Sequence, residues 1–301
     1  MNGEVTIMYE NFKLAKTEYG TIEAYLWHVD NPDKVVCIIH GIGEYAGRYD
    51  RIADRMREKN IAVISMDLRG HGLTEGPRGH CAPRAKVFDD ITVLLKYAKD
   101  KYPGKDIVMY GHSMGGNITL DYRYRGELCD LPSAYLITSP WITLVQSIPK
   151  PVYRLVKLMA KVAPSVGIHS NVDEELLGNP DYVKPYNDNP LVFNKISLAC
   201  AVDGFDIGFA LRDGTLDEKD AAKATPTLIM IGSEDKVCDP QGSRDLFARM
   251  QKADENVGLI EWHDLYHEIH NGGKESTGDE VIDRIVQYVI DPSDMSDPQE
   301  A

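Results

Sequence analysis

Short apolar runs alternate with helical patterns along most of this chain, and this alternation limits the fold more than any other feature. Nearly continuous apolar runs such as 35–39 are typical of strands that are covered on both faces of a sheet. Strands that alternate with helices predict an α/β fold with a mostly parallel central sheet flanked by helices. We expect strands at 35–39, 61–66, 106–110, 134–137, 227–231 and 257–262, helices near 48–59, 84–101, 115–125, 242–252 and 279–290, and antiparallel edge strands within 11–28.

One interval is too long for this rhythm. Ile137 and Thr227 lie about 90 residues apart, whereas a simple crossover between parallel strands takes roughly 30. The excess is rich in proline, and we interpret it as an inserted helical cap. The last residues are polar and contain two prolines, which predicts a flexible tail. The expected organisation is an α/β core at 1–140 and 196–291, a cap at 141–195 and a tail at 292–301.

Composition excludes several classes of partner. The formal net charge of −14 repels phosphate backbones and argues against nucleic-acid binding. No apolar run is long enough for a membrane span, and the first residues lack the pattern of a secretory signal. The five cysteines are scattered without a CxxC pair, so we interpret them as free thiols in a reducing compartment. Together these observations predict a cytoplasmic protein.

The segment Gly111-His112-Ser113-Met114-Gly115-Gly116 follows one predicted strand and opens a predicted helix. A bare G-x-S-x-G pattern is weak, because a glycine-rich turn with a capping serine gives the same letters. The strand–turn–helix context is that of the nucleophile elbow of the α/β-hydrolase fold, where glycines permit a very tight turn. The helix N-terminus there favours a developing negative charge. We therefore predict Ser113 as the nucleophile of a serine hydrolase.

A serine nucleophile needs a base, and the base needs a carboxylate that orients it. In this fold the chain order is serine, acid, histidine, each in a loop after a strand. After strand 227–231 the candidate acids are Glu234, Asp235 and Asp239. Asp239 precedes a proline and fits the N-cap of a helix. Asp235 lies nearer the usual turn position than Glu234, so we predict Asp235 as the acid.

Three histidines, His263, His267 and His270, follow the last predicted strand, and their spacing alone does not choose the base. A metal site is an alternative, because His267 and His270 are three residues apart. No carboxylate or cysteine at ligand spacing completes such a site, so we expect neither a metal nor a cofactor. The oxyanion hole needs two backbone N–H groups. We assign them to Met114, next after the nucleophile, and to Ile42 in the loop after the first parallel strand.

Six stretches stand in the order found in a known family: His40–Tyr49, Asp67–Gly72, Glu75–Gly79, Gly111–Gly116, Tyr186–Leu191 and Tyr266–Glu268. Through them the chain resembles the monoacylglycerol lipase and lysophospholipase family of serine α/β hydrolases. The stretches run across nearly the whole chain, so the similarity is specific at the family level. The resemblance implies that His267 is the catalytic base, and it supports Asp235 as the acid.

The same resemblance implies hydrolysis of carboxylic esters of single-chain lipids, monoacylglycerols or lysophospholipids, through an acyl-enzyme intermediate and without a cofactor. It also implies that Glu44, Arg48, His112 and Tyr186 line the polar end of the site and bind the head group. For Glu44 and Arg48 the alternative is a structural ion pair that holds the oxyanion loop. The alternative functions are hydrolysis of short-chain or aryl esters and a non-catalytic binding protein with this fold.

Residues 150–162 predict an amphipathic helix inside the cap. At 100° per residue its four cations fall within a wedge of about 60°, and its apolar residues lie on another side. A basic amphipathic helix in an acidic protein favours transient contact with a membrane surface. The alternative is that the apolar side packs on the acyl pocket while the cations are simply solvated. The cations are Lys150, Arg154, Lys157 and Lys161, and the apolar residues are Val152, Leu155, Leu158, Met159 and Val162.

Overall fold

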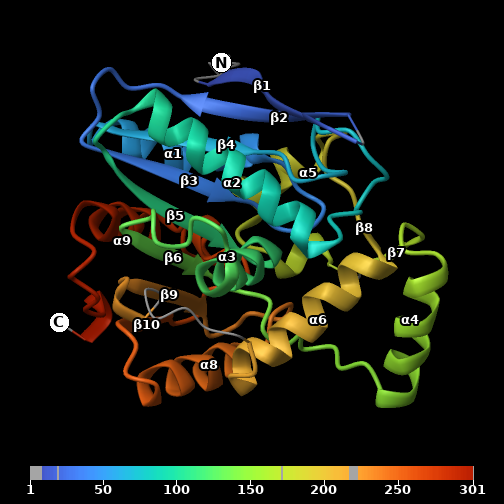
Figure 1. Cartoon of the computed structure of the whole chain (residues 1–301). Coiled ribbons are helices and arrows are strands. Elements are labelled where there is room, and N and C mark those ends of the chain that lie inside the picture. Colours follow the sequence, from blue (N-terminus) through green and yellow to red (C-terminus); the bar gives the residue numbers. More distant parts are fainter. Residues whose placement is uncertain (1–8, 19, 171, 217–222, 301) are drawn as a thin grey trace.

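The computed structural model describes residues 9–18, 20–170, 172–216 and 223–300. Within them an eight-stranded sheet is formed by β1 (Glu10–Thr17), β2 (Gly20–Trp27), β3 (Lys34–Ile39), β4 (Ile61–Met66), β5 (Asp106–His112), β6 (Ala134–Thr138), β9 (Thr227–Gly232) and β10 (Val257–Trp262). Its order is β1-β2-β4-β3-β5-β6-β9-β10 (Figure 1). The β1–β2 and β2–β4 pairs are antiparallel, and every pair from β4 to β10 is parallel. The predicted sheet with antiparallel edge strands is confirmed.

The predicted helices are present with ends that differ by a few residues. The pattern at 48–59 corresponds to a short 3-10 turn, η1 (Ala46–Tyr49), followed by α1 (Asp50–Arg57). Buried side chains from two or more helices pack on each face of the sheet, so the core has three layers. One face carries α1 and α9 (Asp279–Ile290), and the other carries α2 (Arg84–Lys101), α3 (Met114–Arg125), α6 (Leu198–Asp213) and α8 (Pro240–Lys252).

The continuous apolar runs are explained by this double cover. Along β3, Val35, Cys37 and Ile39 pack toward α2 and α3, whereas Val36 and Ile38 pack toward α1 and α9. All five side chains are fully buried. A strand with both faces covered has no solvent side, so apolar and polar residues do not alternate along it. The parallel strands also bring their carboxyl ends to one edge of the sheet, where loops from distant parts of the chain meet.

Residues 141–195 are called the cap segment here, with the bounds predicted from the sequence. The segment contains α4 (Lys150–Val162), β7 (Gly167–His169), η2 (Glu174–Leu176) and α5 (Pro180–Asn187). After it, β8 (Lys195–Ser197) pairs antiparallel with β7 and leads directly into α6. In Figure 1, α4 stands at the right-hand edge, away from the central sheet, and it packs on α6.

The apolar side of α4 faces solvent. Leu155, Leu158 and Val162 are 56%, 61% and 82% exposed. A different and narrower side of the helix meets α6, where the hydroxyl of Tyr153 donates to a carboxylate oxygen of Asp206 at 2.8 Å. The alternative in which the apolar side packs on the acyl pocket is therefore wrong. Helical periodicity gives the angle between two sides, but it does not say which side a neighbouring helix covers.

Residues 292–300 make specific contacts with the core, in contrast to the flexible tail predicted from their composition. The guanidinium of Arg284 donates to the carbonyl oxygens of Asp294 at 2.8 Å and Ser296 at 3.1 Å. The side chain of Gln299 donates to the carbonyl of Glu261 at 2.9 Å. Arg284 is buried and needs acceptors, which these residues supply. Nothing local in the sequence marks that need.

Two expectations from composition can be compared with the described residues. Among them, no helix is both long enough and apolar enough to cross a membrane. All five cysteines lie within the described ranges, and each is buried and free. Burial raises the pKa of the Cys37 thiol to about 12, which keeps it protonated.

Candidate active site

Ser113 occupies a sharp turn between β5 and α3. Its backbone has φ 56° and ψ −119°, a combination that costs energy for any residue with a side chain. The turn leaves no room beside it, because a Cβ on Gly115 would lie 2.0 Å from the carbonyl oxygen of Ile39. A Cβ on Gly111 would lie 2.5 Å from the carbonyl oxygen of Gly115. The expected strand–turn–helix is present, and it places the serine at the N-terminus of α3.

Ser113, His267 and Asp235 form one hydrogen-bonded line. His267 Nε2 lies 2.8 Å from Ser113 Oγ, and His267 Nδ1 lies 2.8 Å from Asp235 Oδ2. All three side chains are buried. The second carboxylate oxygen, Asp235 Oδ1, accepts the backbone N–H groups of Val237 at 2.8 Å and Cys238 at 2.9 Å. The acid is thus fixed by its own turn, and one oxygen remains for the histidine.

The other candidates for acid and base lie outside this line. Glu234 forms a surface ion pair with Lys236 at 2.9 Å. Asp239 is the N-cap of α8 and accepts the N–H of Gln241 at 2.9 Å, as its position before a proline predicts. His263 is exposed at the surface. None of the three contacts Ser113 or His267 in the described part of the chain.

The histidines in the site differ in their ability to hold a proton. Burial lowers the pKa of His270 to about 4 and holds the pKa of His112 well below its ordinary value. Burial also acts against a charge on His267, but the carboxylate of Asp235 outweighs it and raises the pKa of His267. Of the three histidines, His267 is therefore the one whose surroundings favour the protonated form. Among the described residues, no group of His, Cys, Asp or Glu side chains is arranged to hold a metal ion.

The backbone N–H groups of Ile42 and Met114, predicted as the oxyanion donors, belong to segments that border Ser113. Met114 is the next residue after Ser113, and the loop that carries Ile42 touches it: a Cβ on Gly41 would lie 3.1 Å from Ser113 Cβ. Across the described ranges, neither N–H donates to a protein acceptor. Both donors are therefore available to an oxygen atom bound at Ser113.

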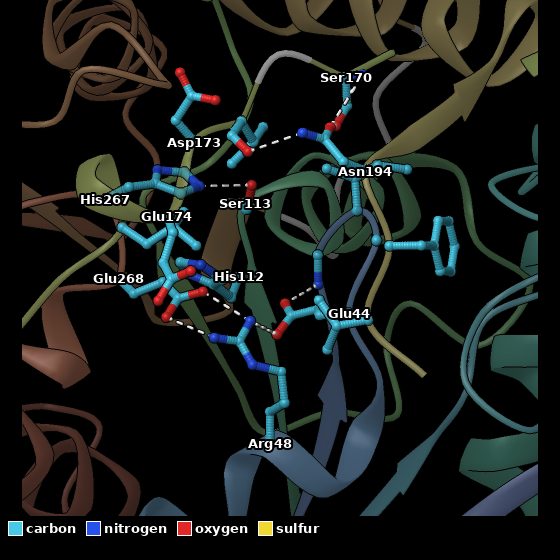
Figure 2. A pocket seen from close by; sticks show the side chains of 17 residues that line it. Glu44, Arg48, His112, Ser113, Ser170, Asp173, Glu174, Asn194, His267 and Glu268 are labelled. Carbon is cyan, nitrogen blue, oxygen red and sulfur yellow. Dashed lines mark hydrogen bonds and ion pairs between the residues drawn. The ribbon is translucent and has the colours of Figure 1, made fainter. Parts of the chain in front are cut away.

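A cavity of about 310 Å³ reaches Ser113 (Figure 2). We call it the polar cavity because charged side chains line it, although apolar groups form about half of its lining. Of the predicted head-group residues, Glu44, Arg48 and His112 line it and are buried. The fourth, Tyr186, belongs to α5, but its side chain lies outside the part that the structure describes. The lining residues that the cap segment contributes were not predicted; they include Ser170, Val172, Asp173, Glu174 and Asn194.

A second cavity of about 250 Å³ also reaches Ser113, and its lining is mainly apolar. Ile148 and Ile168 line this cavity and are also more than one-third exposed, next to the exposed side of α4. The cavity therefore opens beside the apolar surface of the cap segment. The lining includes Ile42, Trp141, Leu144, Val156, Ile196, Ala201, Phe205 and Cys238.

The ion pair that is the alternative role for Glu44 and Arg48 is present, with 2.9 Å between Arg48 Nη1 and Glu44 Oε2. The sequence analysis missed its third member. Glu268, the residue after His267, binds the same guanidinium at 2.8 and 2.9 Å (Figure 2). Burial raises the pKa of Glu44; in Glu268, Arg48 outweighs burial and lowers the pKa. In the sequence, Glu268 stands beside the predicted base and ends the family-like stretch Tyr266–Glu268, but neither fact indicates that it binds Arg48.

Comparison with known proteins agrees with this geometry. Residues 30–273 match the model of a family described as serine aminopeptidase S33. A monoacylglycerol lipase from Mycolicibacterium smegmatis is 28% identical over 268 residues, which cover 88% of this chain and 91% of that protein.

Solved structures give the same result. A soluble variant of monoglyceride lipase from Saccharomyces cerevisiae, in complex with a substrate analog, has a TM-score of 0.77 at 25% identity, with 96% of each chain covered. A monoacylglycerol lipase from Paleococcus ferrophilus has a TM-score of 0.78 at 25% identity, over 90% of this chain and 99% of that one. The chain therefore belongs to the serine aminopeptidase S33 family and, among the serine α/β hydrolases, to the monoacylglycerol lipase and lysophospholipase family that its sequence resembles.

Proposed function

We propose that this hydrolase cleaves the ester bond of monoacylglycerols through an acyl-enzyme intermediate on Ser113. The observation that carries the proposal is that one polar and one mainly apolar cavity both reach Ser113. An ester with a single fatty acyl chain and a small hydroxylated head group matches both cavities at once. The similarity to the monoacylglycerol lipase of Mycolicibacterium smegmatis supports the same substrate class.

In the proposed reaction Ser113 Oγ attacks the ester carbonyl carbon while His267 Nε2 takes the hydroxyl proton. Asp235 accepts the Nδ1–H and stabilises the imidazolium. The N–H groups of Ile42 and Met114 bind the oxyanion. The ester C–O bond then breaks, and His267 gives its proton to the departing glycerol oxygen. A water molecule deprotonated by His267 then attacks the acyl carbon. The bond from this carbon to Ser113 Oγ breaks, Oγ takes the proton back from His267, and the fatty acid leaves.

The polar cavity favours an uncharged head group over a phosphate. Its lining includes the carboxylates of Glu44, Asp173, Glu174 and Glu268. Arg48, which lies in the same lining, is already bonded to Glu44 and Glu268. A phosphate placed here meets several like charges, and the repulsion is strong in a partly buried site. This charge balance supports monoacylglycerols over lysophospholipids.

A panel of glycerol esters that differ only in acyl length tests the proposal. We expect kcat/KM to rise by up to about fourfold per added methylene until the apolar cavity is filled. At equal acyl length, we expect the glycerol ester to be hydrolysed at least about tenfold faster than the glycerol phosphate ester. All esters should be presented in the same neutral detergent micelle. An optimum at two to four carbons would instead assign the protein as a short-chain esterase.

We also propose that α4 places the mouth of the apolar cavity on a lipid surface. Nine exposed apolar side chains within residues 145–168 are typical of a surface that binds an apolar partner. The exposed cations Lys150, Arg154 and Lys161 flank it, as in helices that lie at a membrane interface. Lys157, the fourth predicted cation, pairs with Asp206 at 2.7 Å. The exposed apolar residues are Val145, Ile148, Val152, Leu155, Leu158, Met159, Val162, Val166 and Ile168.

Co-sedimentation with vesicles of phosphatidylcholine and an anionic phospholipid tests this contact. We expect the double substitution Leu155→Ser and Leu158→Ser to lower the bound-to-free ratio by about tenfold or more, because two large apolar side chains lose their burial in lipid. Leu73→Ser is the matched control, because Leu73 is 48% exposed but lies outside the cap segment. Equal binding of the double variant and wild type, or equal loss in the control, would count against the proposal.

A further inference from the structure

Arg48 lies between two loops that both border the site. One loop follows β3 and carries Gly41 and Ile42; the other follows β10 and carries His267. The side chains of Glu44, Arg48 and Glu268 are 7%, 6% and 4% exposed. Two carboxylates therefore share one guanidinium away from water.

The ends of this cluster are bonded to the two loops. Glu44 Oε1 accepts the backbone N–H of Gly41 at 2.5 Å and the hydroxyl of Tyr49 at 3.1 Å. At the other end, Glu268 Oε2 accepts the side-chain amide of Asn271 at 2.8 Å. A continuous chain of charge-assisted hydrogen bonds thus runs from the backbone N–H of Gly41, which precedes Ile42, to the carboxylate of Glu268, which follows His267.

We propose that Glu268 is a positioning residue, which through Arg48 and Glu44 fixes the loop of His267 relative to the backbone N–H of Ile42. This inference rests on the proposed function, in which the base and the oxyanion donors act on the same ester. A buried cluster of this kind adds little to stability, since desolvation of the charges offsets their attraction. Its effect is geometric, because a displacement of about 1 Å between reacting groups lowers a rate by roughly 10²-fold.

The same carboxylate leaves a second signature. His267 is in contact with Asp235 and Ser113, the ring of His112 lies next to it, and the ring of His270 packs against His112. Burial opposes a charge on His267, but Asp235 first, and then Glu268 and Glu44, raise its pKa. Only neutral His267 can act as a base, so the rate falls as the pH drops through this pKa. Removal of one negative charge lowers the pKa of His267 and moves the acid limb of the profile to lower pH.

The test is the pH profile of a long-chain glycerol ester with Glu268→Gln and Glu268→Ala. We expect kcat to fall about tenfold in the glutamine variant, which keeps the shape, and about 10²-fold in the alanine variant. KM should change less than twofold. The acid limb of kcat/KM should move to lower pH in both. Active-site titration with a fluorophosphonate normalises each rate to folded enzyme.

Glu255→Gln is the matched control, because Glu255 is another buried carboxylate, bonded to Arg123 at 2.7 Å and Arg249 at 3.2 Å. It should lower thermal stability and leave kcat and the pH profile unchanged. If Glu268→Gln has the kcat and the acid limb of the wild type, the inference is overturned. The proposed function still stands in that case, provided that Ser113→Ala loses ester hydrolysis. If Glu268→Gln does not fold, Glu44→Gln serves as the test and should also move the acid limb of kcat/KM to lower pH. An acid limb that does not move in Glu44→Gln would then overturn the inference.

Discussion

Ser113→Ala is expected to lower kcat on a long-chain monoacylglycerol by about 10⁵-fold. The variant has no oxygen that can form an acyl-enzyme. The remaining rate over water comes from the oxyanion donors and from binding alone. The loss should appear in kcat rather than in KM, because both cavities keep their linings. Steady-state release of fatty acid measures it, and the variant should also fail to react with a fluorophosphonate.

Ser139→Ala is a suitable control for that loss. Ser139 is buried directly after β6, beside β5, which ends at His112, and it also has a positive φ. It has no place in the proposed reaction, so kcat should stay within about threefold of wild type. If Ser113→Ala retains more than one-hundredth of the wild-type kcat, the proposed nucleophile is wrong.

Asp235→Asn should lower kcat by about 10⁴-fold without unfolding the protein. The oxygen of the new amide can keep the N–H bonds from Val237 and Cys238 that hold the turn. Its NH₂ group then faces His267 Nδ1, which must become an acceptor. The proton of the imidazole moves to Nε2, so that His267 can no longer take the proton of Ser113.

Two neighbouring substitutions separate this effect from a general disturbance of the loop. Asp239→Asn should leave kcat nearly unchanged, because asparagine caps a helix as well as aspartate does. Glu234→Gln should also be nearly neutral, since Glu234 pairs at the surface with Lys236. A large loss in Glu234→Gln together with an active Asp235→Asn would reassign the acid to Glu234. Thermal unfolding of each variant shows whether the fold is intact.

The sequence predicts most of the fold because the signals involved are local. The continuous apolar run of β3 indicates that helices cover both faces of the strand. The helix at 150–162 has the bounds expected from its prolines. The elbow at Ser113 is equally local, since its glycines and its position between strand and helix are visible together. Asp239 as an N-cap follows from the proline after it.

Other parts of the site depend on contacts between distant residues. Spacing could not choose among His263, His267 and His270, because the choice depends on which ring reaches a serine 154 residues away. Glu268 gives no local signal, since its partner Arg48 is 220 residues away. For the same reason the sequence does not show which side of α4 is exposed, because the packing of α4 on α6 decides this.

The cations of α4 also affect how the molecule turns in an electric field. The chain has a net charge of −14, yet 150–171 contains no acidic residue and four Lys or Arg. The molecule is therefore an electric dipole with α4 near its positive end. An anionic bilayer exerts a torque on such a dipole within roughly a Debye length, about 8 Å at physiological ionic strength. For the membrane contact proposed above, we therefore expect the body to be repelled and the helix attracted, so that α4 turns toward the bilayer before any apolar side chain reaches the lipid.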